Sequence, residues 1–321
     1  MMKMMVGCAA ALVLLAGGGA AQADEWPAKP VRILVGSPPG GGTDAMARAV
    51  ADRLGPLLNQ PVVVENRPGA SNTIAADVTA KSADGHTMVM GVVTAHGIAP
   101  HLLKLNYDSN KDLVPVVFVG AVPNVLVVNN DVPADSVKAL VALARKEPGK
   151  LNFASSGAGS TQHIAAEMFK DAAGIDISHV PYKGSGGAMV DLIGGQVQLS
   201  FDTLPSVLGQ IKSNKIRALA VTTAQRNPQL PKVPTMAEAG YPGVAISAWY
   251  GIYMPASTPK SVQDKVHGSV TQVLALPETR ARLEAIGADI GPMSQAQFAD
   301  FHAAEYKRFG DIIKKNNIRT D

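Results

Sequence analysis

The sequence contains a single cysteine, Cys8, among its 321 residues. Disulfide bonds within the chain are therefore excluded, and so is a zinc site built from cysteine pairs. The histidines form no His-Glu-x-x-His stretch, and His96 and His101 are five residues apart. We therefore expect no metal and no cofactor, and a fold that its hydrophobic core holds together.

Clusters of positive charge are also missing. The chain has 29 Lys and Arg against 26 Asp and Glu, a formal net charge of +3. Nucleic acid is not an expected partner, because neutralising phosphates requires clustered basic side chains. Lys314, Lys315 and Arg319 are interpreted as the solvated end of a helix. No segment after the N-terminal region is long and apolar enough for a membrane span, so we expect a soluble mature protein.

Residues 1–23 have the pattern of a secretory signal peptide. Lys3 precedes an apolar run from Ala9 to Leu15, and small residues follow up to Ala23. The run is too short to span a bilayer comfortably. Cys8 precedes it, whereas a lipidated cysteine should follow one, so a lipid anchor is not expected. We predict cleavage after Ala23 and a periplasmic monomer.

From Val31 onward, short β-branched runs alternate with helical patterns. The predicted strands are Val31 to Val35, Val62 to Glu65 and Thr87 to Gly91, with helices Thr43 to Leu58 and Asn72 to Lys81 between them. A second series follows, with helices 136–146, 160–173, 185–193 and 204–212 and strands 151–154, 177–180, 197–201 and 217–221. This order predicts an α/β fold with parallel strands and helices on the sheet faces.

Two segments are predicted to cross between domains. The apolar stretch Val114 to Val128 is long enough for two strands broken at Pro123-Asn124, and Ala245 to Met254 has the pattern of a returning strand. We therefore expect a discontinuous first domain, 24–123 plus 246–321, and a second domain, 124–245. Beyond the returning strand, Thr258 and Pro259 predict a helix start, with Thr258 as the cap and Pro259 as the first helical residue.

The loop after the first strand is rich in glycine and opens a helix. Gly40, Gly41 and Gly42 precede Thr43 and Asp44. The first N–H groups of a helix have no internal partner, and glycines let a ligand approach them, so an anion is the expected guest. The loop lacks the Lys of a Walker motif and the spacing of a dinucleotide fingerprint. Asp44 is interpreted as a capping residue that favours the helix dipole.

A second loop of this kind, which also opens a helix, lies in the middle of the chain. We call the Gly40 to Asp44 loop the first mouth and this loop the second mouth. Hydroxyls and glycines gather before a helix at Ser155, Ser156, Gly159, Ser160 and Thr161. These groups suit hydrogen bonds to a carboxylate. A nucleophilic serine is not expected, because no Gly-x-Ser-x-Gly elbow is present. The chain is therefore predicted not to be an enzyme.

Two further strand ends carry polar residues where open α/β sheets bind ligands. One has Tyr182, Lys183 and Gly184, and the other has Asp202 and Thr203. Asp202 is interpreted first as a cap of the following helix, and as an acceptor from a ligand hydroxyl or ammonium in the alternative.

Motifs along the whole mature chain resemble the Bug family of periplasmic solute-binding proteins, the receptors of tripartite tricarboxylate transporters. They are Trp26 to Ile33, Pro39 to Asp44 with Ala47-Arg48, Val64 to Ala70, Ser155 to His163, Val180 to Gly184, Gly194 to Val197 with Phe201-Asp202, Arg217 to Val221, Pro234-Thr235 with Glu238 to Gly240, and Trp249 to Gly251.

The resemblance implies a type II periplasmic-binding-protein fold, in which two α/β domains with two crossing segments close on a small carboxylate. It places Gly40 to Thr43 on one wall and Ser155, Ser156, Gly159, Ser160 and Thr161 on the other. Tyr182 to Gly184, Asp202 and Thr203 lie nearby, and Thr94 and Ala95 border the ligand. The implied partners are a small organic carboxylate and the membrane permease subunits of the transporter.

Three alternatives stay open. The chain could be a sensor subunit that contacts a histidine kinase, because the presenting surface would look similar. It could be a secreted hydrolase that uses Ser155 or Ser160. It could also bind amino acids or nicotinate-like aromatic acids, and contact of Asp202 or Asp44 with an ammonium group would favour the amino acid.

Overall fold

The structure is a computed structural model that describes residues 26–319. The predicted signal peptide lies outside the described residues. No helix within residues 26–319 is long and apolar enough to cross a membrane.

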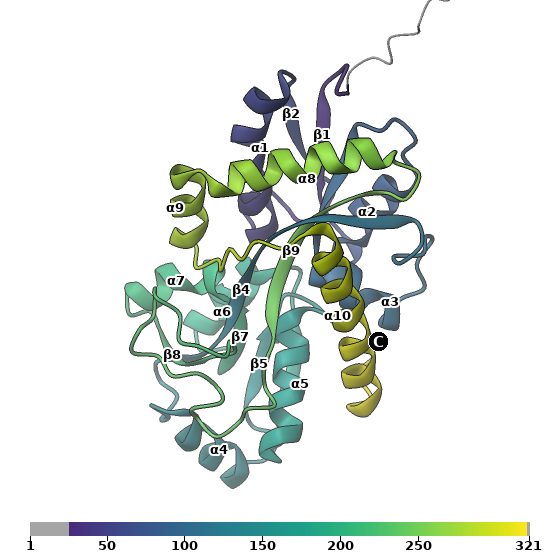
Figure 1. The fold of residues 1–321 in the computed structure, drawn as a ribbon. Helices are drawn as coiled ribbons and strands as arrows, with labels where there is room; N and C mark the ends of the chain where they lie inside the picture. Colours follow the sequence, from purple (N-terminus) through teal and green to yellow (C-terminus); the bar gives the residue numbers. More distant parts are fainter. Residues whose placement is uncertain (1–25, 320–321) are drawn as a thin grey trace, which may run out of the picture.

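One twisted sheet runs through the molecule (Figure 1). Its order is β2-β1-β3-β9-β4-β7-β5-β6, with β8 also paired to β4. The pairs of β1 with β2 and β3, and of β5 with β6 and β7, are parallel, whereas β4 and β9 run antiparallel to their neighbours. The strands are β1 Val31–Val35, β2 Val62–Asn66, β3 Thr87–Val92, β4 Leu113–Asn129, β5 Asn152–Ser155, β6 Ser178–Pro181, β7 Leu199–Thr203, β8 Ile216–Val221 and β9 Ser247–Pro255.

Helices alternate with these strands and cover the sheet. They are α1 Gly42–Leu58, α2 Thr73–Ala80, α3 Ala99–Leu102, α4 Val137–Lys146, α5 Thr161–Ala173, α6 Ser185–Ile193, α7 Leu204–Lys212, α8 Lys260–Ala275, α9 Pro277–Ala285 and α10 Gln295–Lys315, with a 3₁₀ turn η1 Ala70–Asn72 and a π-helical turn η2 Thr94–Ile98. The predicted α/β alternation is confirmed. The short elements η1, η2 and α3 have no counterpart in the sequence prediction.

β4 is the strand on which the two halves of the sheet meet. Its first part pairs with β9 as far as Pro123, opposite Ser247, and from Asn124 it pairs with β7, opposite Thr203. The prediction of two strands broken at Pro123-Asn124 was wrong, since β4 is continuous. Proline lacks a backbone donor, but here it stands where the strand changes partners, so its missing N–H does not interrupt the strand.

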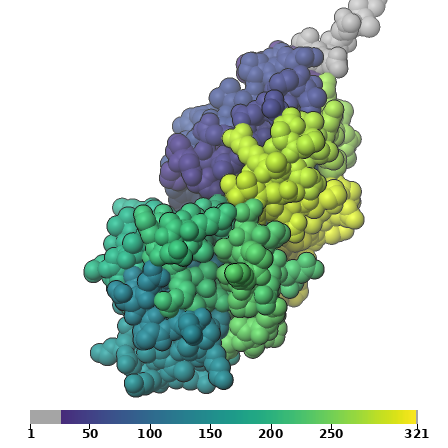
Figure 2. Space-filling view, turned by 90° about the vertical axis from the view of Figure 1, so that its left-hand side faces the viewer, coloured from purple at the N-terminus to yellow at the C-terminus, as the bar shows by residue number. Residues whose placement is uncertain are grey.

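The early and the late parts of residues 26–319 contribute to the same half of the molecule. In Figure 2 the early residues and the late residues together form the upper part, and the middle of the chain forms the lower part. α10 extends from the upper part toward the lower part, and its end reaches α5 (Figure 1). There Lys315 pairs with Asp171 at 2.7 Å, and Ile318 is buried just beyond the helix.

The start of α8 differs from the prediction. Pro259 occupies the N-cap position, with an extended ψ of 142°, and Lys260 is the first helical residue. The buried hydroxyl of Thr258 has no hydrogen-bond partner, so Thr258 does not cap the helix. Pro259 therefore ends the preceding turn and does not occupy the first helical position.

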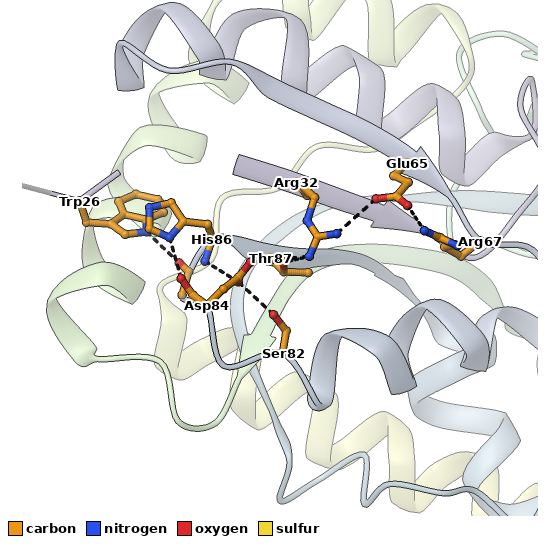
Figure 3. Close-up of polar contacts among 9 residues, drawn as sticks. Trp26, Arg32, Glu65, Arg67, Ser82, Asp84, His86 and Thr87 are labelled. Atoms are coloured by element: carbon orange, nitrogen blue, oxygen red, sulfur yellow. Dashed lines mark hydrogen bonds and ion pairs between the residues drawn. The ribbon is translucent and has the colours of Figure 1, made fainter. Parts of the chain in front are cut away.

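A polar cluster ties the N-terminal segment to β1, β2 and β3 (Figure 3). The Trp26 indole donates to the carbonyl of Gly85 at 2.8 Å, and Arg32 Nη2 donates to Thr87 Oγ1 at 2.7 Å. Arg32 also pairs with Glu65 and with Asp84, each at 3.6 Å. These contacts give several residues of the Trp26 to Ile33 and Val64 to Ala70 motifs a structural role in holding the strands together.

Candidate functional site

The Gly-rich loop delivers the N-terminus of α1 to the carboxyl end of β1. The first helical bond runs from the Ala45 N–H to the Gly41 carbonyl, so the N–H groups of Gly42, Thr43 and Asp44 precede the intrahelical series. Gly40 has a φ of +83°, which favours glycine. The 17-residue helix therefore presents its positive end at this loop.

Asp44 is committed to holding this loop in shape. Its Oδ2 accepts from the Gly40 N–H and from Arg48 Nε, both at 2.9 Å, and its Oδ1 accepts from Asn66 Nδ2 at 2.9 Å. Burial raises the pKa of Asp44, but the bonds from Arg48, Gly40 and Asn66 outweigh it, so the pKa is lowered. Both oxygens have donors within the protein. The residue is not the N-cap of α1, which is Gly41.

A strained turn borders the same edge of the sheet. Ala70, Ser71 and Asn72 all have positive φ, between 44° and 70°, which is rare for residues other than glycine. The turn brings Asn72 against Gly36, where a Cβ would lie 2.5 Å from the Asn72 Cα. Asn72 Nδ2 donates to Thr94 Oγ1 at 2.9 Å, and its buried Oδ1 has no partner. Thr94 and Ala95 begin the π-helical turn η2, a feature frequent at functional sites.

Gln162, which sequence reasoning missed, organises the second mouth. Its Oε1 accepts from Ser156 Oγ at 3.0 Å and from Thr161 Oγ1 at 3.3 Å. Its Nε2 donates to Asp202 Oδ1 at 2.9 Å and to Ser185 Oγ at 3.3 Å. The only signal in the sequence is its place in the first turn of α5, from which a side chain leans back over the helix N-terminus.

Asp202 lies where three helices begin. Its Oδ1 accepts from Gln162 on α5, from Ser185 Oγ on α6 at 2.8 Å and from the Thr203 N–H before α7 at 2.7 Å. It is not the N-cap of α7, since Thr203 holds that position. The carboxyl ends of β5, β6 and β7 thus bring three helix N-termini together, as expected at one edge of a parallel sheet.

The other predicted site residues on the second half of the sheet make separate local contacts. Ser160 caps α5 by accepting from the His163 N–H, and Thr203 Oγ1 bonds to Ser206 Oγ at 3.0 Å. Tyr182 donates to Asp191 Oδ2 at 2.6 Å. Lys183 is exposed, and the N–H of Gly184 bonds to the Ser156 carbonyl at 3.1 Å. Gly159 N–H donates to His163 Nδ1 at 3.2 Å.

Two stacked histidines support the second mouth from behind. The rings of His163 and His179 are 4.1 Å apart and nearly parallel. Burial lowers the pKa of each to about 4, so both are neutral near pH 7. Ser155 lies 2.6 Å from His179 Nε2, but it is fully buried and its hydroxyl donates to the Gly157 carbonyl. This serine braces the loop and offers no exposed nucleophile.

Tyr250 on β9 lies beside the first helical residue of α1. A Cβ added to Gly42 would lie 3.2 Å from the Tyr250 hydroxyl oxygen. Burial raises the pKa of this phenol well above its usual range, and the charge of Asp202 adds to the effect. The phenol therefore lies beside the start of α1, and the charge of Asp202 reaches it.

Metal ligands do not gather at this site. Among residues 26–319, no group of three or more His, Cys, Asp or Glu side chains could hold a metal ion. The hydrogen-bonding groups at the two loops are backbone N–H groups, hydroxyls, carboxamides, a phenol and the carboxyl groups of Asp44 and Asp202. Such a set has the chemistry to bind and orient a small polar ligand.

Comparison with known proteins defines the class. Residues 46–318 match the sequence profile of the tripartite tricarboxylate transporter family receptor. The chain belongs to this family, which confirms the predicted Bug-type resemblance. Because the family consists of substrate-binding receptors, the chain is a receptor and not an enzyme, and the hydrolase alternative is set aside.

Individual relatives cover nearly the whole chain. Protein BugT of Bordetella pertussis is 38% identical over 300 residues, which are 92% of this chain and 92% of the relative. The R. palustris protein Rpa4515 with adipate superposes with a TM-score of 0.87 at 36% identity, covering 92% and 99% of the two chains. MatC from Rhodopseudomonas palustris with bound malate gives a TM-score of 0.83 at 30% identity, covering 90% and 100%. The predicted periplasmic-binding-protein fold is thereby confirmed.

Proposed function

We propose that this receptor captures a small dicarboxylate or tricarboxylate between the start of α1 and the starts of α5, α6 and α7. The observation that carries the proposal is that the N-termini of α5, α6 and α7 meet at Asp202, whose charge reaches the Tyr250 hydroxyl beside the start of α1. Helix N-termini favour anions, and a ligand with two carboxylates could contact both mouths. The adipate and malate of the two solved relatives support this ligand class.

The proposed domain boundaries follow the strand pairing of the sheet. We place domain 1 at 24–123 plus 246–321 and domain 2 at 124–245, because β4 changes partners between Pro123 and Asn124. A ligand that contacts both domains binds their closed arrangement better, and this differential affinity would drive closure. The proposed location is the periplasm, and the proposed partner of the closed receptor is the membrane permease of a tripartite tricarboxylate transporter. Delivery to a sensor kinase is the alternative partner.

Thermal unfolding tests the ligand class. Residues 24–321, stripped of ligand by unfolding and refolding, are heated with adipate, malate, citrate, amino acids and nicotinate. A ligand that binds only the folded state raises the midpoint by mass action. We expect a rise with one class of carboxylates and none with their methyl esters. No rise with any anion would contradict the proposal.

A substitution at Gly42 tests the position of the ligand. Gly42→Val would direct a bulky side chain toward the Tyr250 hydroxyl, and we expect it to abolish the ligand-induced rise. Gly209→Val is the matched control, because Gly209 is exposed on α7 and nothing lies within 4 Å of its Cβ position. The control should leave the midpoint of the unliganded protein unchanged or slightly higher and keep the ligand-induced rise. Loss of the rise in both variants would argue against a site at Gly42.

A further inference from the structure

The two oxygens of the Asp202 carboxyl group have unequal surroundings. Oδ1 accepts three hydrogen bonds, from Gln162, Ser185 and the Thr203 N–H, at 2.7 to 2.9 Å. Oδ2 is buried and has no hydrogen-bond partner. The residue as a whole is 1% exposed. One oxygen is therefore saturated with donors, and the other has none.

An ionised carboxylate is poorly served by this arrangement. A buried acceptor without a donor retains its full desolvation cost, and the cost is greater when the group is charged. A proton removes the charge, and it can only reside on Oδ2 because Oδ1 already receives three donors. The protonated group would then present an O–H donor at the place where the ionised group lacks a partner.

The groups that face Asp202 do not favour its negative charge strongly. They are Gln162 from α5, Ser185 from α6, Thr203 at the start of α7 and Val125, its cross-strand neighbour on β4, and all are neutral. Asp202 also influences one titratable group, Tyr250. Burial and the charge of Asp202 both raise the pKa of this phenol, so Tyr250 stays neutral as well. Burial raises the pKa of Asp202, and the hydrogen bonds from its neutral neighbours only partly offset this.

We propose that Asp202 carries a proton on Oδ2 in the liganded receptor and donates it to a carboxylate oxygen of the ligand. The inference rests on the proposed function, because it assigns one contact of the same ligand. The pair is an O–H to O⁻ hydrogen bond, in which the acid is neutral and the ligand keeps its charge. Asp202 then recognises a carboxylate without repelling it, and capture is coupled to proton uptake wherever the unliganded Asp202 is ionised.

Calorimetric titration of the ligand-stripped receptor tests this coupling. A carboxylate found by thermal unfolding is titrated from about pH 7 to about pH 9, where the ligand itself stays ionised, in buffers of different ionisation enthalpy. We expect uptake of up to one proton per ligand somewhere in this range. Above the pKa of the unliganded group, affinity should fall by up to about tenfold per pH unit.

Substitution separates this proposal from an ionised Asp202. Asp202→Asn keeps an oxygen for the three donors and supplies an N–H donor in place of Oδ2. We expect it to remove both the proton uptake and the pH dependence, and to exceed the affinity of the wild type near pH 9. Asp171→Asn, at the exposed end of α5, is the matched control and should behave as the wild type.

Infrared spectroscopy gives a readout that does not depend on the pKa of the unliganded group. The wild-type complex should show a protonated-carboxyl carbonyl band that is absent from the Asp202→Asn complex. The proposal is overturned if that band is missing from the complex, if carboxylates bind without proton uptake to a receptor whose unliganded form lacks the band, or if Asp202→Asn abolishes binding while ammonium-bearing ligands bind best to the wild type. Failure of every carboxylate to bind the wild type would instead overturn the proposed function.

Discussion

The carboxylate of Asp44 accepts a hydrogen bond from the guanidinium Nε of Arg48 at 2.9 Å, one turn further along α1. The same oxygen accepts from the Gly40 N–H, so the pair fixes the loop that opens the helix. The guanidinium group of Arg48 pairs with Asp44, and Arg48 lies about one turn inside the helix. An anion at this loop would therefore meet backbone N–H groups instead of a guanidinium group.

Removing the Asp44 carboxylate should loosen the loop. Asp44→Ala removes the acceptor of the Gly40 N–H and one acceptor each of Arg48 and Asn66, and we expect a loss of about 2 to 4 kcal/mol in the free energy of unfolding. Asp52→Ala is the matched control on the same helix, because Asp52 is exposed and pairs with Arg282 at the surface. The control should cost less than about 1 kcal/mol. Urea unfolding of both variants measures the difference, and equal losses would contradict the structural role of Asp44.

Gly36 should tolerate no side chain. Its Cβ would lie 2.5 Å from the Asn72 Cα and 2.8 Å from the Asn72 carbonyl oxygen, so Gly36→Ala must displace the strained turn. We expect a lower melting temperature and weaker ligand-induced stabilisation. Gly268→Ala in α8 is the control, because nothing lies within 4 Å of its Cβ position and alanine favours a helix interior by about 0.5 to 1 kcal/mol. A Gly36→Ala protein as stable as the wild type would contradict this prediction, because the turn would then move without loss of stability.

Gln162→Leu should weaken ligand binding more than it weakens the fold. The substitution removes the acceptor of Ser156 and Thr161 and one donor to Asp202. We expect a loss of affinity of about tenfold or more, which corresponds to about 1.4 kcal/mol.

Gln198→Leu is the matched control for this change. Gln198 bonds to Asn152 and Gly195 at the opposite end of the sheet. It should cost stability and leave affinity unchanged in the same titration. Equal affinity losses in the two variants would argue that the binding effect is indirect.

The buried histidines predict a loss of stability in acid. Burial lowers the pKa of His163, His179 and His302 to about 4 in the folded protein, against about 6.5 in the unfolded chain. The unfolded chain then binds more protons between these values, so stability rises with pH there. The contribution of these neutral histidines to the free energy of unfolding should be fully present above about pH 6.5 and decline as the pH falls toward about 4.

His179→Phe tests which groups cause the acid sensitivity. Phenylalanine can keep the stacking on Phe153 but cannot take up a proton, so the difference in stability between about pH 7 and about pH 4.5 should shrink. The variant should lose some stability at neutral pH, because the contact with Ser155 is gone. Urea unfolding at the two pH values measures both effects. A difference as large as that of the wild type would exclude His179 as a cause.

The sequence predicted those parts of the fold that depend on local periodicity and end signals. The helix over Ser185 to Ile193 has the predicted bounds, and Gly174 ends α5 with a left-handed φ of 58°. β4 could not be predicted as one strand, because Pro123 looks like a break until its change of partner is known. Pairing across β4 and β9 depends on residues more than a hundred positions apart.

The sequence predicted the loops of the candidate site, but it did not predict the side-chain hydrogen bonds that join them. Glycines, hydroxyls and strand ends identified Gly40 to Thr43 and Ser155 to Thr161 from the sequence. Gln162 and Asn72 were missed, because their roles depend on contacts with Asp202 and Thr94. Neither an amide inside a helix nor an asparagine in a turn has a sequence pattern that reveals such a partner.

The measurement that tests the central claim most directly is a calorimetric titration of ligand-stripped residues 24–321 with malate and adipate, each compared with its dimethyl ester. Proteins with these bound acids are close relatives of this chain. The account predicts saturable binding of at least one free acid, no binding of its ester, and loss of that binding in Gly42→Val but not in Gly209→Val. Binding of ester and acid alike, or binding untouched by Gly42→Val, would contradict it.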